Sequence, residues 1–500
     1  MDIEQLKTDV AAGKLSQDKL LAVIVAQQKR IAELEELIRA KNPTARVDEP
    51  YSVKAEELRK RKAELAKQKA NRKRANKGSK KIRRGRVTTA DKVALAARTE
   101  LVYPAGVTAD QCQPSHTRVA WRLENGRAVL VAYEIYRCGN IYGKPTGILG
   151  RSEFGIEIFI ALAYQVYCLG LSIDKACKLL SFFEQLKIRK SQADALLNQL
   201  SLAWESEFDC LCTLLANSAV VHCDETSWSI NSVWAFLNEK LTVLFYGVHK
   251  DGDTLAQILN KETFAGVLVS DDAAVYQDFD QSQKCWAHLI RKAIKLTLQD
   301  PQNREYRKLA DGLLNVYRQA KRIKADKRLL DSTRCARVAE LDDQLLDLCA
   351  ARWIDEDTSG TEVENDYRRL CNEVMRLMID KELFVFVTKP EVDGTNNAAE
   401  RQLRDDAMAR KTGRTSKTPN GAKRRSIISS VLQSIGKNIG TFTLSAVIAE
   451  VQRWLEIGES SFAAQVQELK ARIQAPRPPN PAPETTAKSL LDRVVLSADS

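Results

Sequence analysis

Residues 219–270 decide the fold and read AVVHCDETSWSINSVWAFLNEKLTVLFYGVHKDGDTLAQILNKETFAGVLVS. The stretch contains four short runs of apolar or β-branched residues, at 219–222, 233–237, 241–248 and 266–270. A run with helical character, at 254–259, precedes the fourth of them. Strands mixed with a helix in this order predict an α/β layer.

Carboxylates follow two of the four predicted strands. The first runs into Asp224-Glu225-Thr226, and the fourth runs into Asp271-Asp272. Hard cations such as Mg²⁺ take oxygen ligands, and two ions about 3.5–4 Å apart can hold both the attacking and the leaving oxygen of a phosphodiester. Adjacent strand residues point to opposite faces, so at most one residue of each pair is expected to reach such ions. Taken alone, the same residues also fit helix caps or turns.

A third carboxylate lies in the first turn of a later helix. The helix is predicted to open at Asn396-Asn-Ala-Ala-Glu400, where Glu400 can complete a metal-binding triad. Arg401 and Arg404 can hold phosphates there, assisted by the positive end of the helix dipole. The alternative is that Glu400 only stabilises the helix start. A basic run then follows, made of Arg410, Lys411, Arg414, Lys417, Lys423, Arg424 and Arg425.

The N-terminal region combines a heptad pattern with a block of positive charge. Spacings of three and four residues join Leu20, Ile24, Gln27, Ile31, Leu34 and Ile38, which predicts a dimerising coiled coil within residues 1–42, or else a helix packed on its own body. The segment 54–86 holds 16 basic and three acidic residues, a charge of +13 in a chain whose total is +12. Such a block indicates a polyanion partner, and double-stranded DNA is favoured over a membrane because no apolar face accompanies it. The arm residues expected to contact DNA are Arg72, Lys73, Arg74, Arg83, Arg84 and Arg86. A solvated tail is the alternative.

Residues 151–217 are predicted to be helical and to contain a helix-turn-helix. Its two helices correspond to 170–180 and 188–197, with Ser191 as the expected cap of the second. Arg189 and Lys190 would then lie at the leading end, where recognition helices meet base edges. A plain pair of packed helices is the alternative.

Composition narrows the class of protein. The 500 residues call for several domains, and 44% hydrophobic with 28% charged residues is typical of a globular chain. No apolar run approaches the roughly 20 residues that cross a bilayer, and the acidic N-terminus lacks an apolar signal core. The eleven cysteines are scattered and include no Cys-x-x-Cys pair, so a reducing cytoplasm is expected. Cys112, His116 and Cys138 offer three zinc ligands where a structural site needs four, so zinc is not expected.

Four segments in this order resemble the DDE transposases of insertion-sequence family sixty-six. They are Asp224-Glu-Thr226, Gly266-Val-Leu-Val-Ser-Asp271 with Tyr276, Cys285-Trp-Ala-His288-x-x-Arg291, and Asn396-Asn-x-x-Glu400-Arg-x-x-Arg404 with Arg410-Lys411. The resemblance covers residues 142–458, and the layout of the N-terminal region is also similar. It departs from the family pattern at Thr395, at Thr412 and in the missing Cys-x-x-Cys pairs of the zinc-like module.

The resemblance implies an α/β, ribonuclease-H-like catalytic core interrupted by a helical insertion. It implies that Asp224, Asp271 and Glu400 hold two Mg²⁺ ions, which Mn²⁺ can replace. Cys285 and His288 are expected to brace the insertion against the core, and metal binding by this pair is the alternative. The expected activity is cleavage and strand transfer of transposon-end DNA in the nucleoid, by a homodimer or higher assembly with possible accessory proteins. The alternatives are a catalytically silent DNA-binding relic or regulator, and a Mg²⁺ nuclease without strand transfer.

Sequence pattern and resemblance together divide the chain into eight expected parts. They are a coiled coil (1–42), a basic arm (43–98), a β-rich, zinc-like module (99–150), a helical DNA-binding region (151–217), the first part of the core (218–284), the helical insertion (285–390), the second part of the core (391–458), and a C-terminal helix with a Pro-rich tail (459–500).

Overall fold

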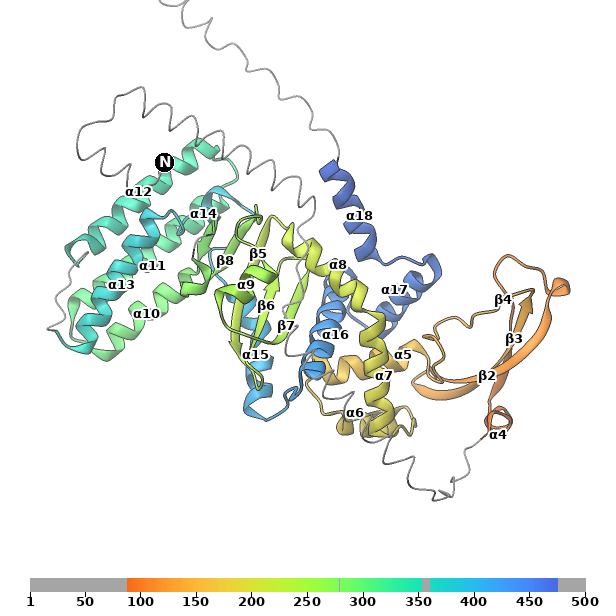
Figure 1. Ribbon diagram of the computed structural model, residues 1–500. Helices are drawn as coiled ribbons and strands as arrows, with labels where there is room; N and C mark the ends of the chain where they lie inside the picture. The colour runs from red at the N-terminus through yellow and green to blue at the C-terminus, as the bar shows by residue number, and fades with distance from the viewer. Residues whose placement is uncertain (1–87, 278, 353–359, 475–500) are drawn as a thin grey trace, which may run out of the picture. The chain divides into compact units, whose positions relative to one another are not determined.

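The computed structural model describes residues 88–277, 279–352 and 360–474 (Figure 1). The predicted coiled coil, the basic arm up to Val87 and the Pro-rich tail lie outside these residues. Of the described residues, those up to Ala463 belong to one compact unit, and 464–474 are assigned to a second one. None of the described helices is both long enough and apolar enough to cross a membrane.

A twisted sheet of four strands forms the predicted β-rich region. Its strands are β1 (Arg98–Val102), β2 (Gln113–Glu124), β3 (Arg127–Cys138) and β4 (Ile141–Tyr142). The order is β1-β3-β2, with β4 beside β3, and β2 and β3 form an antiparallel hairpin. The hairpin turns at Asn125 and Gly126, which both have positive φ, and Asn-Gly is the residue pair that such a tight turn prefers.

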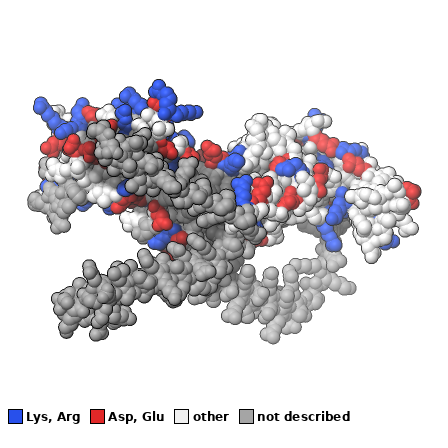
Figure 2. Space-filling model, turned by 90° about the horizontal axis from the view of Figure 1, so that it is seen from above, with Lys and Arg blue, Asp and Glu red and all other residues white. Residues whose placement is uncertain are grey.

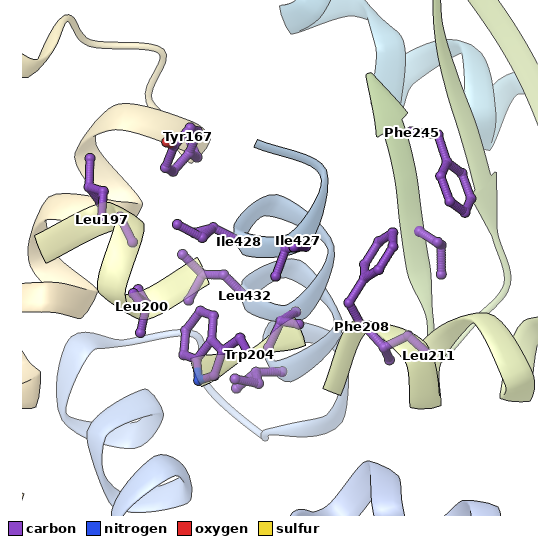
Figure 3. Close-up of a cluster of buried hydrophobic side chains, with 14 of the residues drawn as sticks. Tyr167, Leu197, Leu200, Trp204, Phe208, Leu211, Phe245, Ile427, Ile428 and Leu432 are labelled. Carbon is purple, nitrogen blue, oxygen red and sulfur yellow. The ribbon is translucent and has the colours of Figure 1, made fainter. Parts of the chain in front are cut away.

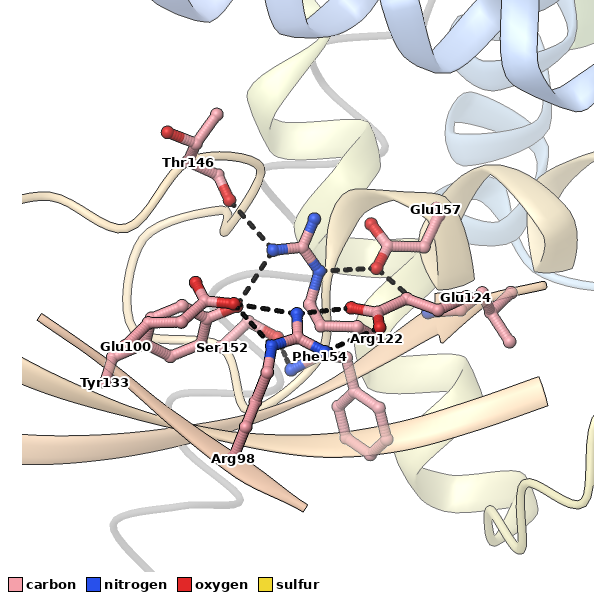
Figure 4. A network of polar contacts seen from close by, with 10 residues as sticks. Arg98, Glu100, Arg122, Glu124, Tyr133, Thr146, Ser152, Phe154 and Glu157 are labelled. Carbon is pink, nitrogen blue, oxygen red and sulfur yellow. Dashed lines mark hydrogen bonds and ion pairs between the residues drawn. The ribbon is translucent and has the colours of Figure 1, made fainter. Parts of the chain in front are cut away.

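An ion pair fastens this sheet to the helical region (Figure 4). Arg122 on β2 donates from Nε to Oε1 of the buried Glu157 at 2.6 Å, and the same oxygen accepts the backbone N–H of Leu123 at 3.1 Å. The guanidinium also donates to the Tyr133 hydroxyl and to the Thr146 carbonyl. Because a buried carboxylate needs such partners, this contact fixes the sheet against the helix that carries Glu157.

Several helical segments precede the second sheet. Those within residues 151–217 lie where helices were predicted, whereas the one at 89–94 lies in the predicted basic arm. The segments are α4 (Thr89–Ala94), α5 (Ile156–Ala163), the π-helical turn η2 (Tyr164–Cys168), α6 (Ile173–Phe183), α7 (Lys190–Ala203) and α8 (Glu205–Ala216). The pair α6 and α7 confirms the predicted pair of helices. The predicted cap was wrong: α7 starts at Lys190 with Arg189 as its N-cap, so Ser191 lies inside the helix. Gln192 stabilises this start instead, by accepting the backbone N–H of Arg189 at 3.1 Å.

The second sheet has five strands and confirms the predicted α/β class. They are β5 (Val220–Ser227), β6 (Ser232–Leu237), β7 (Thr242–Val248), β8 (Val267–Ser270) and β9 (Ser282–Lys284), in the order β7-β6-β5-β8-β9. The pairs β5–β6 and β6–β7 are antiparallel, while β5–β8 and β8–β9 are parallel. Helix α9 (Gly252–Ile258) precedes β8, as predicted.

The remaining helices follow the sheet in the sequence. They are α10 (Trp286–Gln299), α11 (Arg304–Ala325), α12 (Asp331–Cys349), α13 (Glu362–Ile379), α14 (Val385–Thr388), α15 (Asn397–Lys411), α16 (Pro419–Asn438), α17 (Leu444–Ile457) and α18 (Ser461–Gln474). Helices α10 to α14 share one apolar core with Val267 and Val269 of β8. Helix α15 packs through Ala399 and Leu403 on Val233 and Ala235 of β6.

The opposite face of the sheet packs on α16 and on the helices before the sheet (Figure 3). Trp204 and Phe208 lie beside Ile427 and Ile428 of α16, and Phe245 of β7 joins the same core. The sheet is therefore covered by helices on both faces, as an α/β layer requires.

A ladder of serines joins α16 to the edge strand β7. The hydroxyl oxygens of Ser426, Ser430 and Ser434, spaced by four residues, accept the backbone N–H groups of Tyr246, Leu244 and Thr242 at 2.8–3.0 Å. All three serines are buried. Side chains here replace the missing neighbour strand, which satisfies an otherwise unpaired sheet edge.

Replacing Ser430 with alanine is expected to lower the free energy of unfolding by about 1–3 kcal/mol, because the buried N–H of Leu244 loses its acceptor. Ser429 supplies the matched control, since its hydroxyl is equally buried and makes no hydrogen bond. Urea denaturation should show Ser429→Ala to be neutral or stabilising. Equal losses in the two variants would contradict the ladder.

Candidate active site

Asp224 lies in β5, where that strand parts from β8. The antiparallel pairing of β5 with β6 continues to Ser227, so the expectation that the first strand ends at Asp224 was wrong. The parallel pairing with β8 stops earlier, at His222 opposite Val269. Asp224 follows His222 by two residues and Asp271 follows Val269 by two residues. The two carboxylates therefore stand at equivalent positions of adjacent parallel strands, directly beyond their last pair.

Burial and nearby negative charge act together on Asp224. Its pKa is raised to about 7, first by burial and then by the charges of Glu225, Asp271 and Glu400. A single hydrogen bond, from the backbone N–H of Glu225 at 2.9 Å, opposes this rise. The three carboxylates predicted as a triad thus lie close enough to act on one another electrostatically.

The acidic neighbour of each aspartate has a cationic partner of its own. Glu225 accepts from Lys250 Nζ at 2.5 Å and from the Tyr276 hydroxyl. Asp272 accepts from Arg376 Nη2 at 2.5 Å. Asp271, in contrast, accepts the backbone N–H of Ala273 at 3.1 Å. Glu225 and Asp272 therefore each have a cationic partner, whereas Asp224 and Asp271 each accept a backbone N–H.

Glu400 lies in the first turn of α15, as predicted. Its carboxylate accepts two hydrogen bonds from Arg291 of α10, at 2.6 and 3.3 Å, and lies 3.6 Å from His288 Nδ1. Arg291 is about half exposed, so this ion pair is of the kind that contributes little to stability. A guanidinium on the carboxylate shows that Glu400 is placed to hold positive charge.

Asn396 fixes the start of α15 against the sheet. Its side chain is 1% exposed and donates from Nδ2 to the carbonyl of Cys223 at 2.7 Å, directly before Asp224. Its Oδ1 lies 3.3 Å from His222 Nδ1, and its backbone N–H donates to Cys285 Sγ at 3.1 Å. The carbonyl of Asn396 then accepts the N–H of Glu400 at 3.2 Å. One buried amide therefore ties the third carboxylate to the strand of the first.

Cys285 and His288 lie between the helical insertion and α15. Cys285 is the N-cap of α10 and is buried, and burial raises the pKa of its thiol. Together with Glu400 these side chains place one ligand atom each within 4.8 Å of one another. Among the described residues, neither the triad Asp224, Asp271 and Glu400 nor the set Cys112, His116 and Cys138 forms a group that tight.

The comparison with known families bears on residues 151–424. That range, more than half of the chain, matches the model described as Transposase IS66 family. The chain belongs to the IS66 transposase family. Membership supports a transposase that acts on DNA, and it agrees with the resemblance seen in the sequence. The curated proteins contain no match.

The cationic residues predicted near the site of this transposase divide into two groups. Arg401, Arg404 and Lys411 are exposed on α15, while Arg410 donates to the carbonyl of Ser227 at 2.9 Å. Lys423, Arg424 and Arg425 were wrongly grouped with them. They pair with Glu205, Asp194 and Asp406 at 2.6, 2.9 and 3.3 Å, so they hold α16 in place.

The helix-turn-helix residues Arg189 and Lys190 are exposed at the start of α7. On the described part of the face drawn in Figure 2, Lys and Arg side chains lie among Asp and Glu side chains. This mixture agrees with a near-neutral body, since the +13 block of the sequence lies outside the described residues. All the arm residues expected to contact DNA, from Arg72 to Arg86, lie outside the described residues.

Several residues of the site escaped the sequence prediction. Lys250 and Arg376 neutralise the acidic neighbours, and both come from segments distant in sequence. Lys284 of β9 is fully buried behind the site and donates to the carbonyl of Tyr276 at 3.0 Å. Burial lowers the pKa of its amine. Lys284 could not be found from the sequence, because the strand that carries it is three residues long and has no hydrophobic pattern.

Two of the three departures from the family pattern, Thr395 and Thr412, flank the helix that carries Glu400. Thr412 is the C-cap of α15, and its hydroxyl donates to the carbonyls of Met408 and Ala409 at 3.0 and 3.2 Å. It therefore closes the helix that carries Glu400. Nothing in the structure explains Thr395.

Proposed function

We propose that this transposase cleaves and joins DNA by DDE chemistry, with Asp224, Asp271 and Glu400 as ligands of two Mg²⁺ ions. One observation carries the proposal: Asp224 and Asp271 follow their last strand pair by the same two residues, and Asn396 ties the helix of Glu400 to the strand of Asp224. Adjacent strand positions and an anchored helix supply the rigid elements that a catalytic constellation needs.

The donor set fits Mg²⁺, with Mn²⁺ as a substitute. All three groups offer carboxylate oxygens, which hard cations prefer. The pKa of Asp224 is raised first by burial and then by the negative charges of its neighbours, and a bound cation would offset both effects on the ionised carboxylate. The ligand atoms of the three carboxylates do not all lie within 4.8 Å of one another. Two ions can span a cluster of this width.

When bound, two such ions supply activation of the attacking oxygen and stabilisation of the leaving oxygen. The residues of the chain orient the reaction. Strands β5 and β8 fix two of the ligands, and α15 presents the third. Arg401 and Arg404, exposed on α15 one and two turns after its start, bind phosphates of the DNA. Water attacks first, and the freed 3′-hydroxyl then attacks target DNA, without a covalent enzyme intermediate.

The topology supports a ribonuclease-H-like core. Three antiparallel strands, β7-β6-β5, continue into the parallel strands β8 and β9, as that fold arranges them. Helices α10 to α14 stand between Asp271 and Glu400 in the sequence, where the helical insertion is expected. The insertion shares its core with β8, so it is packed on the strand that leads to Asp271.

Three further parts of the chain are given roles in assembly on DNA. The exposed Arg189 and Lys190 on α7 would read the transposon ends, the basic arm would supply non-specific affinity, and the coiled coil would pair two copies. Accessory proteins of the element belong to the same proposal. Because phosphate contacts release counterions, binding of transposon-end DNA is expected to weaken by about 10³-fold or more between 50 and 200 mM salt. The dissociation constant is measured by fluorescence anisotropy. A constant that does not change over this range would contradict phosphate binding by the basic arm.

Labelled transposon-end DNA incubated with the full-length protein and Mg²⁺ tests the function. Joined molecules that disappear with EDTA are expected. Nicked ends without joined molecules would indicate the Mg²⁺ nuclease. Tight binding with no cleavage in Mg²⁺ or Mn²⁺, even with the accessory proteins of the element, would indicate the catalytically silent relic or regulator.

A further inference from the structure

Cys285, His288 and Glu400 meet at the junction of two helix starts. Cys285 and His288 stand three residues apart at the start of α10, so both side chains face the same way. Glu400 reaches them from the first turn of α15. The sulfur, an imidazole nitrogen and a carboxylate oxygen all lie within 4.8 Å of one another. The sequence indicated a brace at Cys285 and His288, with metal binding as the alternative, and gave no sign that Glu400 joins them.

The donor set points to a different class of cation from that of the aspartates. Mg²⁺ selects oxygen, whereas Zn²⁺ takes thiolate, imidazole and carboxylate together in a tetrahedral arrangement. Three protein ligands leave the fourth position for water. One ligand atom is also unused, since His288 Nδ1 is buried and forms no hydrogen bond with any residue that the structure describes. Glu400 Oε1 lies 3.6 Å from this nitrogen, which is too far for a hydrogen bond.

The surroundings of the sulfur suit a metal-bound thiolate. Cys285 Sγ accepts the backbone N–H of Asn396 at 3.1 Å, and such outer hydrogen bonds hold a ligand in orientation. The same contact by itself would serve a structural cap. A cap, however, does not require His288 or Glu400 beside the sulfur.

We propose that Cys285, His288 and Glu400 bind a thiophilic divalent cation such as Zn²⁺, and that this ion withdraws Glu400 from the acidic cluster and so inhibits the enzyme. The inhibition rests on the proposed DDE function, but the binding does not. Arg291 opposes the ion, because its guanidinium holds Glu400 at 2.6 Å. About half of that side chain is exposed, so it can swing into solvent when the cation arrives.

Titration of the full-length, reduced protein with Co²⁺ tests the binding, because Zn²⁺ is spectroscopically silent and a cobalt–thiolate bond absorbs. One equivalent with a thiolate band is expected for the wild type. Cys285→Ser removes the soft ligand yet keeps a side chain that can cap α10, so it should abolish the band. Cys335→Ser, which removes an exposed cysteine, should retain it. A band that persists in Cys285→Ser, or none in the wild type at micromolar Co²⁺, would overturn the site.

Two further variants test the sharing of Glu400. Glu400→Gln should weaken Co²⁺ binding by at least about 10–100-fold. Loss of a group that only hydrogen-bonds to a metal ligand has a cost in this range, and Glu400 is itself a proposed ligand. Arg291→Gln should strengthen it, which a purely structural cluster would not do. Unchanged affinity in both variants would overturn the shared ligand.

Inhibition is measured separately, as Mg²⁺-dependent cleavage in the presence of micromolar Zn²⁺. Cleavage should fall in the wild type, and should fall at lower Zn²⁺ in Arg291→Gln. Cleavage that resists Zn²⁺ while Co²⁺ binds would overturn the inhibition. Absence of cleavage in Mg²⁺ alone would count against the proposed function, and the cobalt site would still stand or fall by its own titration.

Discussion

Asp224→Asn is expected to stabilise the metal-free protein above pH 7 and to abolish its Mg²⁺-dependent DNA cleavage. Folding raises the pKa of Asp224 from its ordinary 3.8 to about 7. The folded state therefore holds this proton more tightly, and its stability falls as the pH rises from about 4 to 7. Above pH 7, removing the charge should raise the free energy of unfolding by on the order of 2–4 kcal/mol. Below pH 4 it should leave this free energy unchanged.

The measurement is the melting temperature at pH 4 and pH 8, with EDTA and with Mg²⁺. Wild type should gain stability from Mg²⁺ at pH 8, because a ligand that binds only the folded state stabilises it, and Asp224→Asn should lose most of that gain. The adjacent Glu225→Gln is the control. It should be destabilised, since Lys250 and Tyr276 lose a charged partner. A destabilised Asp224→Asn at pH 8 would contradict the assignment of Asp224 to the cation site.

Asn396→Ala is expected to lower the cleavage rate by about 100-fold, because Glu400 loses its connection to the strand of Asp224 and misplacement by about 1 Å carries that cost. The buried carbonyl of Cys223 also loses its donor, so stability should fall by about 1–3 kcal/mol.

Asn397→Ala is the matched control, since Asn397 is the exposed neighbour on the same helix start and should change stability by less than about 0.5 kcal/mol. Single-turnover cleavage under conditions where both variants are fully folded separates placement from stability. Equal rates for Asn396→Ala and the wild type would show that the amide does not position Glu400.

The sequence was sufficient for the elements whose signal is local. Apolar runs at 219–248 and 266–270 predicted four strands. Asp224 and Asp271 were expected where the first and the fourth of these strands end. Strand β9 was missed, because Ser282 to Lys284 is polar and is buried only through tertiary contacts. The end of the first strand was misplaced, because antiparallel pairing with β6 extends it past the point where β8 leaves.

The partners of the site could not be predicted from one sequence. The identity of the free carboxylate in each acidic pair depends on Lys250 and Arg376, which reach Glu225 and Asp272 from distant segments. Asn396 looked like part of a helix start, and its role arises from three contacts made across the fold. The serines of α16 carried no local sign that they complete a sheet edge. Each of these depends on long-range pairing, which periodicity does not encode.

Strand transfer by Asp271→Asn, compared with Asp272→Asn, tests the central claim most directly. The two residues are adjacent, and within the described part of the chain Asp272 is paired with Arg376 while Asp271 accepts a backbone N–H. With labelled transposon ends, target DNA and Mg²⁺, Asp271→Asn should reduce joined products on the order of 10³-fold or more, while Asp272→Asn retains most of them. Joined products from Asp271→Asn at the wild-type rate would contradict the assignment of Asp271 to the catalytic triad.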